Sequence, residues 1–163
     1  MGGGNIYVMD ADGSNETRLT NNPFRDSNPT WSPDGTRIAF QRKVAIPAGV
    51  GTFEHSTAIY VMNADGSERT YFTNTPYNDT YPVWSPDGTR IAFQSNRDGN
   101  PEIYVMDADG SNVTNLTKHS AADVNPVWSP DGFQILFIRD ADIYVMNADG
   151  SNVTNLTNHP VYD

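Results

Sequence analysis

Residues 82–117 read PVWSPDGTRIAFQSNRDGNPEIYVMDADGSNVTNLT, and two phrases of this stretch recur along the chain. The phrase WSPDG begins at Trp31, Trp84 and Trp128. The phrase IYVM carries the tyrosines Tyr7, Tyr60, Tyr104 and Tyr144, which are 53, 44 and 40 residues apart. A period of this size indicates a repeat architecture in which each unit is one small group of secondary-structure elements.

Each unit predicts four short strands. Ser32 to Gly35 fit a type I turn, with Ser first, Pro second and Gly fourth, so they join two strands. The segment ADGS after IYVM favours a tight hairpin with a left-handed glycine. Neither RIAF nor IYVM alternates between apolar and polar residues, as is typical of strands covered on both faces. Four strands in about 40–45 residues indicate a β-propeller blade.

The sequence therefore predicts an all-β fold in one domain (1–163): a partial β-propeller of four-stranded antiparallel blades. We expect an N-terminal outer half-blade at 5–20 and three complete blades at 28–73, 81–117 and 125–157, the first with an insertion at 42–58. Three blades cannot close a toroid, and an open arc would expose two apolar faces. We therefore expect head-to-tail association with further copies, most simply a homodimer. The alternative is a fragment of a larger propeller.

PTWSPDGTRIAFQ (29–41) and SNRDGNPEIYVMDADGSNVTNLT (95–117) resemble the TolB-type β-propeller repeat, a WD-like blade. The resemblance covers nearly the whole chain except the insertion. It implies a toroid of four-stranded blades, found in periplasmic binding proteins and as gating domains in some serine peptidases. It also implies a periplasmic or secreted bacterial location, although MGGG at the start has no signal-peptide character. The G-x-S-x-G elbow of such peptidases does not occur in this sequence.

Composition limits the partners. Of 163 residues, 37% are hydrophobic, and the formal net charge is −10 with a pI of about 4.5. Nucleic acids and anionic membranes need a basic surface, so neither is expected as a partner. An acidic surface permits cations and basic partner proteins. The chain has no cysteine, which excludes disulfides, thiolate metal sites and a cysteine nucleophile.

The recurrent DADGSN segment has some likeness to a calcium loop. An EF-hand needs glycine at position six and a bidentate glutamate at position twelve. Counted from Asp10 or Asp107, glycine falls at position four and position twelve is Asn21 or Lys118. We therefore interpret the segment as a hairpin turn and expect no metal or cofactor there.

Four aspartates are the main candidate binding residues. Asp26, Asp79 and Asp123 each precede the blade tryptophan by five residues, and Asp163 stands at the matching place after the last LTNHP. In a propeller these side chains would surround one mouth of the central channel. They could bind a cation or a basic partner there. Alternatively, each carboxylate accepts backbone N–H bonds in the crossing loop.

The other candidates are aromatic residues and the insertion. The repeated tryptophans Trp31, Trp84 and Trp128 and the four tyrosines are interpreted as blade-packing residues. The insertion carries Arg42, Lys43, Phe53 and His55. It could be a binding loop, a plain hairpin extension or a contact with a neighbouring chain. Because the sequence shows no nucleophile–base constellation, we expect a non-catalytic scaffold. The alternative is a propeller enzyme acting on carbohydrate or another small ligand.

Overall fold

The computed structural model of the chain describes residues 4–49 and 52–158, where all regular structure is β. The half-blade contains β1 (Tyr7–Val8) and β2 (Thr17–Arg18). Blade 1 contains β3 (Asp26–Trp31), β4 (Arg37–Gly49), β5 (Thr52–Asn63) and β6 (Thr70–Tyr71). Blade 2 contains β7 (Asp79–Trp84), β8 (Arg90–Ser95), β9 (Glu102–Asp107) and β10 (Thr114–Asn115). Blade 3 contains β11 (Asp123–Trp128), β12 (Gln134–Arg139), β13 (Asp142–Asn147) and β14 (Thr154–Asn155). No helix in the described residues could cross a membrane.

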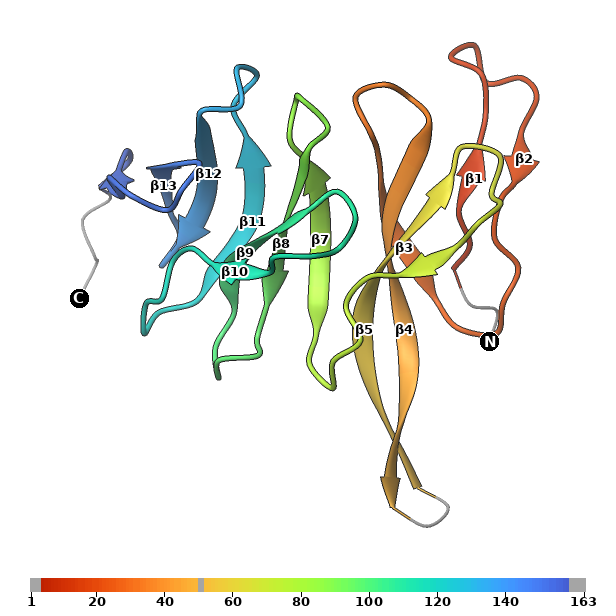
Figure 1. Cartoon of the computed structure of the whole chain (residues 1–163), viewed down its shortest axis with the longest axis horizontal. Helices are drawn as coiled ribbons and strands as arrows, with labels where there is room; N and C mark the ends of the chain where they lie inside the picture. The colour runs from red at the N-terminus through yellow and green to blue at the C-terminus, as the bar shows by residue number, and fades with distance from the viewer. Residues whose placement is uncertain (1–3, 50–51, 159–163) are drawn as a thin grey trace.

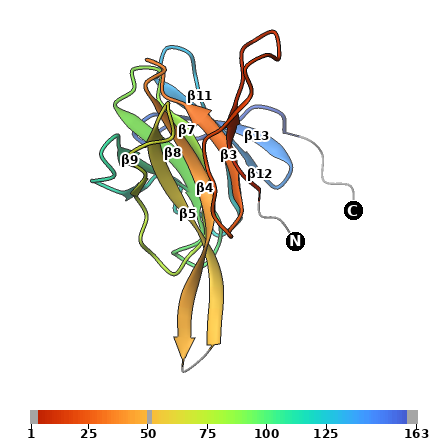
Figure 2. The same cartoon turned by 90° about the vertical axis from the view of Figure 1, so that its right-hand side faces the viewer.

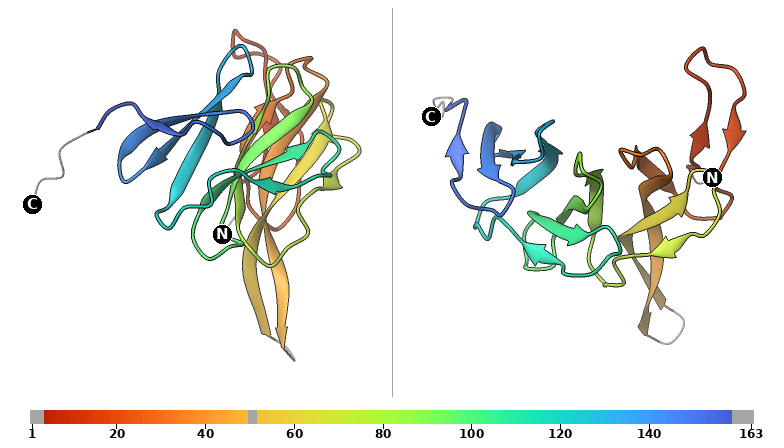
Figure 3. Two further views of the ribbon diagram at one scale, coloured as in Figure 1. Left: turned by 60° about the vertical axis from the view of Figure 1, so that its left-hand side comes forward. Right: turned by 45° about the horizontal axis from the view of Figure 1, so that its top comes forward.

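The three four-stranded sheets are antiparallel, and each keeps its strands in chain order. The predicted partial propeller, with three complete blades and an outer half-blade, is thereby confirmed. Each inner strand begins two residues before the predicted blade boundary, at Asp26, Asp79 and Asp123. The blades stand side by side in Figure 1. The right-hand view of Figure 3 shows them along an open arc, with the half-blade and blade 3 at its ends.

The SPDG segments form the turns between the first and second strands. The backbone N–H of Gly35 donates to the Ser32 carbonyl over 2.9 Å, and Gly35 has a φ of 70°. The Asp34 carboxylate accepts from the Ser32 hydroxyl at 2.6 Å and from the Thr36 N–H at 3.0 Å. The same backbone bond recurs at Gly88 and Gly132. The turn is thus held by an ionised carboxylate.

The turn carboxylates predict that the stability of the fold decreases at acid pH. Hydrogen bonds from Ser32 and Thr36 lower the pKa of Asp34 from 3.8 to about 2. Because the folded-state pKa is depressed, the stabilisation is complete above pH 4 and is lost as the pH falls towards 2. We expect the urea midpoint to fall across this range. The Asp34→Asn variant, measured in parallel, should show a shallower fall; an identical slope would contradict the assignment.

The DADGSN segments form the hairpin turns between the third and outermost strands. The N–H of Gly13 donates to the Asp10 carbonyl at 2.8 Å, and Gly13 has a φ of 85°. The Asp12 carboxylate accepts from the N–H of Ser14 at 2.9 Å. Asp65, Asp109 and Asp149 make the same bond. These hydrogen bonds account for the motif as a turn. Within residues 4–49 and 52–158, no three acidic or histidine side chains group as metal ligands.

The core consists of apolar layers between neighbouring blades. One layer joins Ala39, Ile59 and Val61 of blade 1 to Trp84, Ile91, Phe93, Tyr104 and Met106 of blade 2. A second joins blade 2 to blade 3, and a third joins the half-blade to blade 1. Ile103, which lies between two blades, is fully buried, whereas its counterpart Ile143 at the end of the arc is 43% exposed. A strand is therefore covered on both faces only where a blade lies on each side.

The insertion lengthens β4 and β5 into a two-stranded ribbon that projects from blade 1 (Figures 1 and 2). The pairing runs without a break from Arg37↔Asn63 to Pro47↔Phe53. The pair Phe40↔Tyr60 matches Phe93↔Tyr104 and Phe137↔Tyr144 in the other blades. The extra residues thus extend a hairpin and leave the register of the blade unchanged.

Candidate functional site

The three blade aspartates lie buried in ion pairs. The carboxylates of Asp26, Asp79 and Asp123 have no exposed surface. Asp26 accepts two hydrogen bonds from Arg42, at 2.6 and 2.9 Å, and Asp123 accepts two from Arg139, at 2.6 and 2.7 Å. Asp79 accepts one from Arg97 at 3.0 Å. Each pair joins the first strand of a blade to its second strand or the loop that follows it.

Each arginine also lies over aromatic rings of its own blade. The guanidinium carbons of Arg42, Arg97 and Arg139 lie 4.6, 4.8 and 5.0 Å from the ring centroids of Tyr60, Tyr104 and Tyr144. Such contacts add cation–π attraction to the ion pair. Hydrogen bonding to Asp26 and Asp123 raises the pKa of Arg42 and Arg139. The Asp–Arg–aromatic unit therefore fastens the strands of a blade together.

This geometry differs from the hypothesis that the aspartates form a free carboxylate ring at a channel mouth. Asp26, Asp79 and Asp123 face arginines of the same blade, so their oxygens are not presented to a cation or a basic partner. The structure also differs from the backbone-bonded alternative, because the donors are side chains: a guanidinium group in each blade, with Asn22 also donating to Asp26 and Thr75 to Asp79. Asp163 lies outside the described residues.

The insertion residues do not gather into one site. Arg42 belongs to the blade 1 ion pair, which corrects its interpretation as a loop residue. Lys43 and His55 are exposed on the ribbon, and the side chain of Phe53 lies outside the described part of the chain. Sequence reasoning missed the arginines because their spacing from the blade phenylalanine varies: two residues in blades 1 and 3, four in blade 2. The available signal was an arginine sixteen residues after the aspartate in blades 1 and 3 and eighteen residues after it in blade 2.

The aromatic residues differ between the blades. Trp84 and Trp128 are 6% and 8% exposed and lie in the layers between blades, but Trp31 is 47% exposed. Trp31 departs from the packing expectation because the half-blade before it has no inner strands among the described residues. Tyr104 is buried and Tyr60 and Tyr144 are partly buried, whereas Tyr7 at the end of the arc is 50% exposed.

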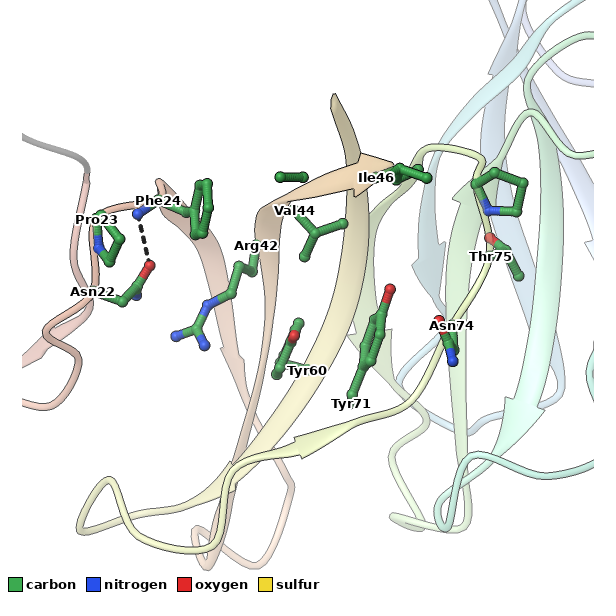
Figure 4. Close-up of a pocket in the computed structure, with 12 residues that line it drawn as sticks. Asn22, Pro23, Phe24, Arg42, Val44, Ile46, Tyr60, Tyr71, Asn74 and Thr75 are labelled. Atoms are coloured by element: carbon green, nitrogen blue, oxygen red, sulfur yellow. Dashed lines mark hydrogen bonds between the residues drawn. The ribbon is translucent and has the colours of Figure 1, made fainter. Parts of the chain in front are cut away.

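A pocket of about 640 Å³ lies on blade 1. Figure 4 shows Pro23 and Phe24 on one side, Val44 and Ile46 from the ribbon, and Thr75 on the other side. The rings of Tyr60 and Tyr71 form its floor, stacked with centroids 4.9 Å apart. The pocket exists because the ribbon prolongs β4 beyond the blade and supplies an apolar wall.

This pocket is where blade 1 departs from its own repeat. In blades 2 and 3 the position of Tyr71 is held by Asn115 and Asn155. Those amides donate to the hydroxyls of Tyr104 and Tyr144 and to neighbouring carboxylates. Blade 1 replaces that polar network with a tyrosine stack, and burial raises the pKa of the Tyr71 hydroxyl. The one cation of the lining, Arg42, is already paired with Asp26, so the pocket suits an uncharged apolar group.

Comparisons with known proteins agree with the architecture. Residues 48–142 match the profile of the TolB beta propeller domain. The chain is 33% identical over 88 residues to the uncharacterized peptidase YuxL of Bacillus subtilis, covering 53% of this chain and 12% of that protein. It is 32% identical over 96 residues to the Tol-Pal system protein TolB of Alcanivorax borkumensis, covering 58% and 20%.

Among solved structures, a puromycin-hydrolyzing peptidase of Mycobacterium tuberculosis superposes with a TM-score of 0.69 at 19% identity. The match covers 96% of this chain and 27% of that one. At this identity the likeness shows the fold alone. The chain spans between 12% and 30% of the length of four curated relatives that it matches, YuxL and the Alcanivorax TolB among them. The shared part is the propeller.

Proposed function

Since this chain belongs to the TolB β-propeller family, we propose that it is a non-catalytic propeller scaffold that binds proteins, including a second copy of itself. Its polar clusters support a structural role, because each buried Asp–Arg pair holds the strands of its own blade together. The observation that carries the proposal is the match between the two ends of the arc: each exposes the residues that the other end would cover.

The outer turns supply one half of that match. A Cβ placed on Gly66 would lie 2.9 Å from the carbonyl oxygen of Leu19, and one on Gly150 would lie 2.8 Å from that of Leu116. A glycine turn of each blade thus packs against the residue that follows the outermost strand of the preceding blade: Gly66 against Leu19, Gly110 against Phe72 and Gly150 against Leu116. Gly13 at the start of the arc has nothing within 4 Å of that position, and Leu156 at its end is 55% exposed. A second copy would bring Leu156 onto Gly13.

The third strands supply the other half. Tyr104 and Met106 of blade 2 are 3% and 1% exposed because they pack on Ile59 and Val61 of blade 1. The half-blade counterparts Tyr7 and Met9 are 50% and 62% exposed. In blade 3, Ile143 is 43% exposed and Val145 is partly buried. Placing Tyr7 and Met9 on Ile143 and Val145 would remove these apolar surfaces from water, which favours association.

The alternative is that further blades of a longer polypeptide cover these faces. It is supported by the length of the relatives, of which this chain spans a small part. The two readings differ in what the isolated 163-residue chain does. Self-assembly predicts association without any other component, whereas the alternative predicts a monomer or non-specific aggregation.

We expect light scattering after gel filtration to give twice the 18.0 kDa chain mass. Leu156→Asp should return the chain to a monomer, because the junction would bury an unpaired carboxylate. Val153→Asp is the matched control: Val153 is 41% exposed, and so is its blade 2 counterpart Val113 at 38%, so this position does not face the next blade. A folded wild-type chain that remains monomeric would refute self-assembly.

Mixing two variants tests the head-to-tail arrangement. Met9→Asp blocks the half-blade face and leaves the blade 3 face intact, and Leu156→Asp does the reverse. Each variant alone should be monomeric, and the mixture should form a heterodimer through the one intact junction. Association of either variant alone would contradict this arrangement.

A further inference from the structure

In the part of the chain that the structure describes, the inner edge of the half-blade has no neighbouring strand. In blades 1, 2 and 3 the third strand lies between the second and the outermost strand. Among the described residues, β1 pairs only with β2. An edge strand presents a row of backbone N–H and C=O groups on which another chain can add a strand.

Trp31, beside this edge, lacks part of the cover that the other tryptophans have. Trp84 lies against Ala39 of the preceding blade's second strand, and the Arg37 guanidinium lies 4.6 Å from its ring. The same arginine donates to the Ala108 carbonyl at 2.9 Å.

Trp128 repeats this arrangement. It lies against Ala92, with Arg90 4.8 Å from its ring and a hydrogen bond from Arg90 to the Ala148 carbonyl at 3.2 Å. For Trp31 the strand that would carry such an alanine and arginine is absent from the described half-blade.

The vacant position is also a hollow. A space of about 250 Å³ lies between β1 and β3, bounded by Ile6, Val8, Pro29 and Trp31. Ile6 and Val8 correspond in the repeat to Ile59 and Val61 of β5, the third strand of blade 1. Ile59 and Val61 lie in the same apolar layer as Trp84. Trp31 therefore has the apolar cover that comes from a third strand, and it lacks the cover that comes from a second strand.

We propose that this edge accepts an extended strand of the pattern Arg-Ile-Ala-Phe from a TolB-type partner chain. The internal copies fix its register: Phe40 pairs with Tyr60 and Ile38 with Met62, so the added Phe and Ile pair with Tyr7 and Met9. Its alanine faces Trp31. Its arginine lies over the Trp31 ring and donates to the carbonyl of Ala64, the counterpart of Ala108. A cationic strand also suits a chain of net charge −10.

A second copy of this chain does not supply the strand, because its β4, β8 and β12 are each paired on both sides. The inference is independent of self-assembly, which uses the outer strands and turns. A monomeric chain that binds the strand would refute self-assembly alone. A dimer that does not bind it would refute the strand site alone.

The test uses the 163-residue chain and a blocked peptide with the sequence of residues 88–95, GTRIAFQS. Because Trp31 is the exposed tryptophan of the three, we expect saturable binding with a blue shift of tryptophan emission. Hydrogen exchange should show new protection at the amides of Tyr7 and Met9. In Trp31→Phe the emission change should disappear while the protection at β1 remains.

A control peptide with the Arg90→Gln change lacks the guanidinium that would cover Trp31. It should bind about tenfold more weakly, because it loses the cation–π contact and the hydrogen bond to Ala64. The proposal is overturned if the two peptides bind equally, if the protection falls on β14 instead of β1, or if no binding occurs up to about 1 mM peptide.

Discussion

Replacing Asp123 with alanine is expected to lower the free energy of unfolding by about 3–5 kcal/mol, the usual cost of removing one partner from a buried ion pair. Asp123 has no exposed side-chain surface, and Arg139 is 9% exposed and donates to both of its carboxylate oxygens. The variant would leave a guanidinium buried over Phe137 and Tyr144 without its counter-ion. Urea unfolding of the variant and the parent chain measures the difference.

Two controls identify the cause of this loss. The double variant Asp123→Ala, Arg139→Ala removes both charges and should recover part of the lost stability. Asp79→Ala should cost less than Asp123→Ala, because Arg97 makes one 3.0 Å bond and is 19% exposed. If Asp123→Ala were as stable as the parent chain but lost affinity for a cation or a basic partner, the free carboxylate ring would be the better description.

The fold could be predicted from the sequence because the same turn and strand signals recur in every blade. Ser32, Asp34 and Gly35 specify one turn by local chemistry, and their counterparts specify it again in each blade. Apolar strands that do not alternate predict cover on both faces, and Ile103 has such cover. The insertion could not be placed as easily, because strand extension and a free loop have similar local sequences. The unbroken strand pairing, for example of Val44 with Ser56, distinguishes them.

The candidate site was less predictable because it depends on contacts across strands. Asp26 was identified by its position, but its partner Arg42 lies sixteen residues away and was assigned to the insertion. The pocket on blade 1 depends on one replacement, Tyr71 where the other blades have Asn115 and Asn155. An interpretation based on the residues that the repeats share does not use such a replacement. A comparison of the positions at which the repeats differ would have identified Tyr71.

Replacing Trp84 with alanine is the second large effect we expect, again about 3–5 kcal/mol of unfolding free energy. Trp84 is 6% exposed, packs on Ala39 of the preceding blade and lies under Arg37, so its loss leaves a cavity and removes a cation–π contact. Trp31→Ala is the matched control at the same repeat position. Trp31 is 47% exposed, so we expect a cost of about 1 kcal/mol, in the usual range for point substitutions.

This pair of variants separates the role of the tryptophan from the role of its surroundings, because the local motif is the same and only the preceding blade differs. Equal costs for the two would mean that the tryptophan stabilises its own turn and strand. In that case the layer between blades would not be the source of stability.

Trp84→Phe keeps part of the apolar contact, and its free energy of unfolding should fall between those of the parent chain and the alanine variant. This milder change keeps the comparison measurable if Trp84→Ala does not fold. Chemical unfolding followed by far-ultraviolet circular dichroism suits all three variants, since the signal does not depend on tryptophan.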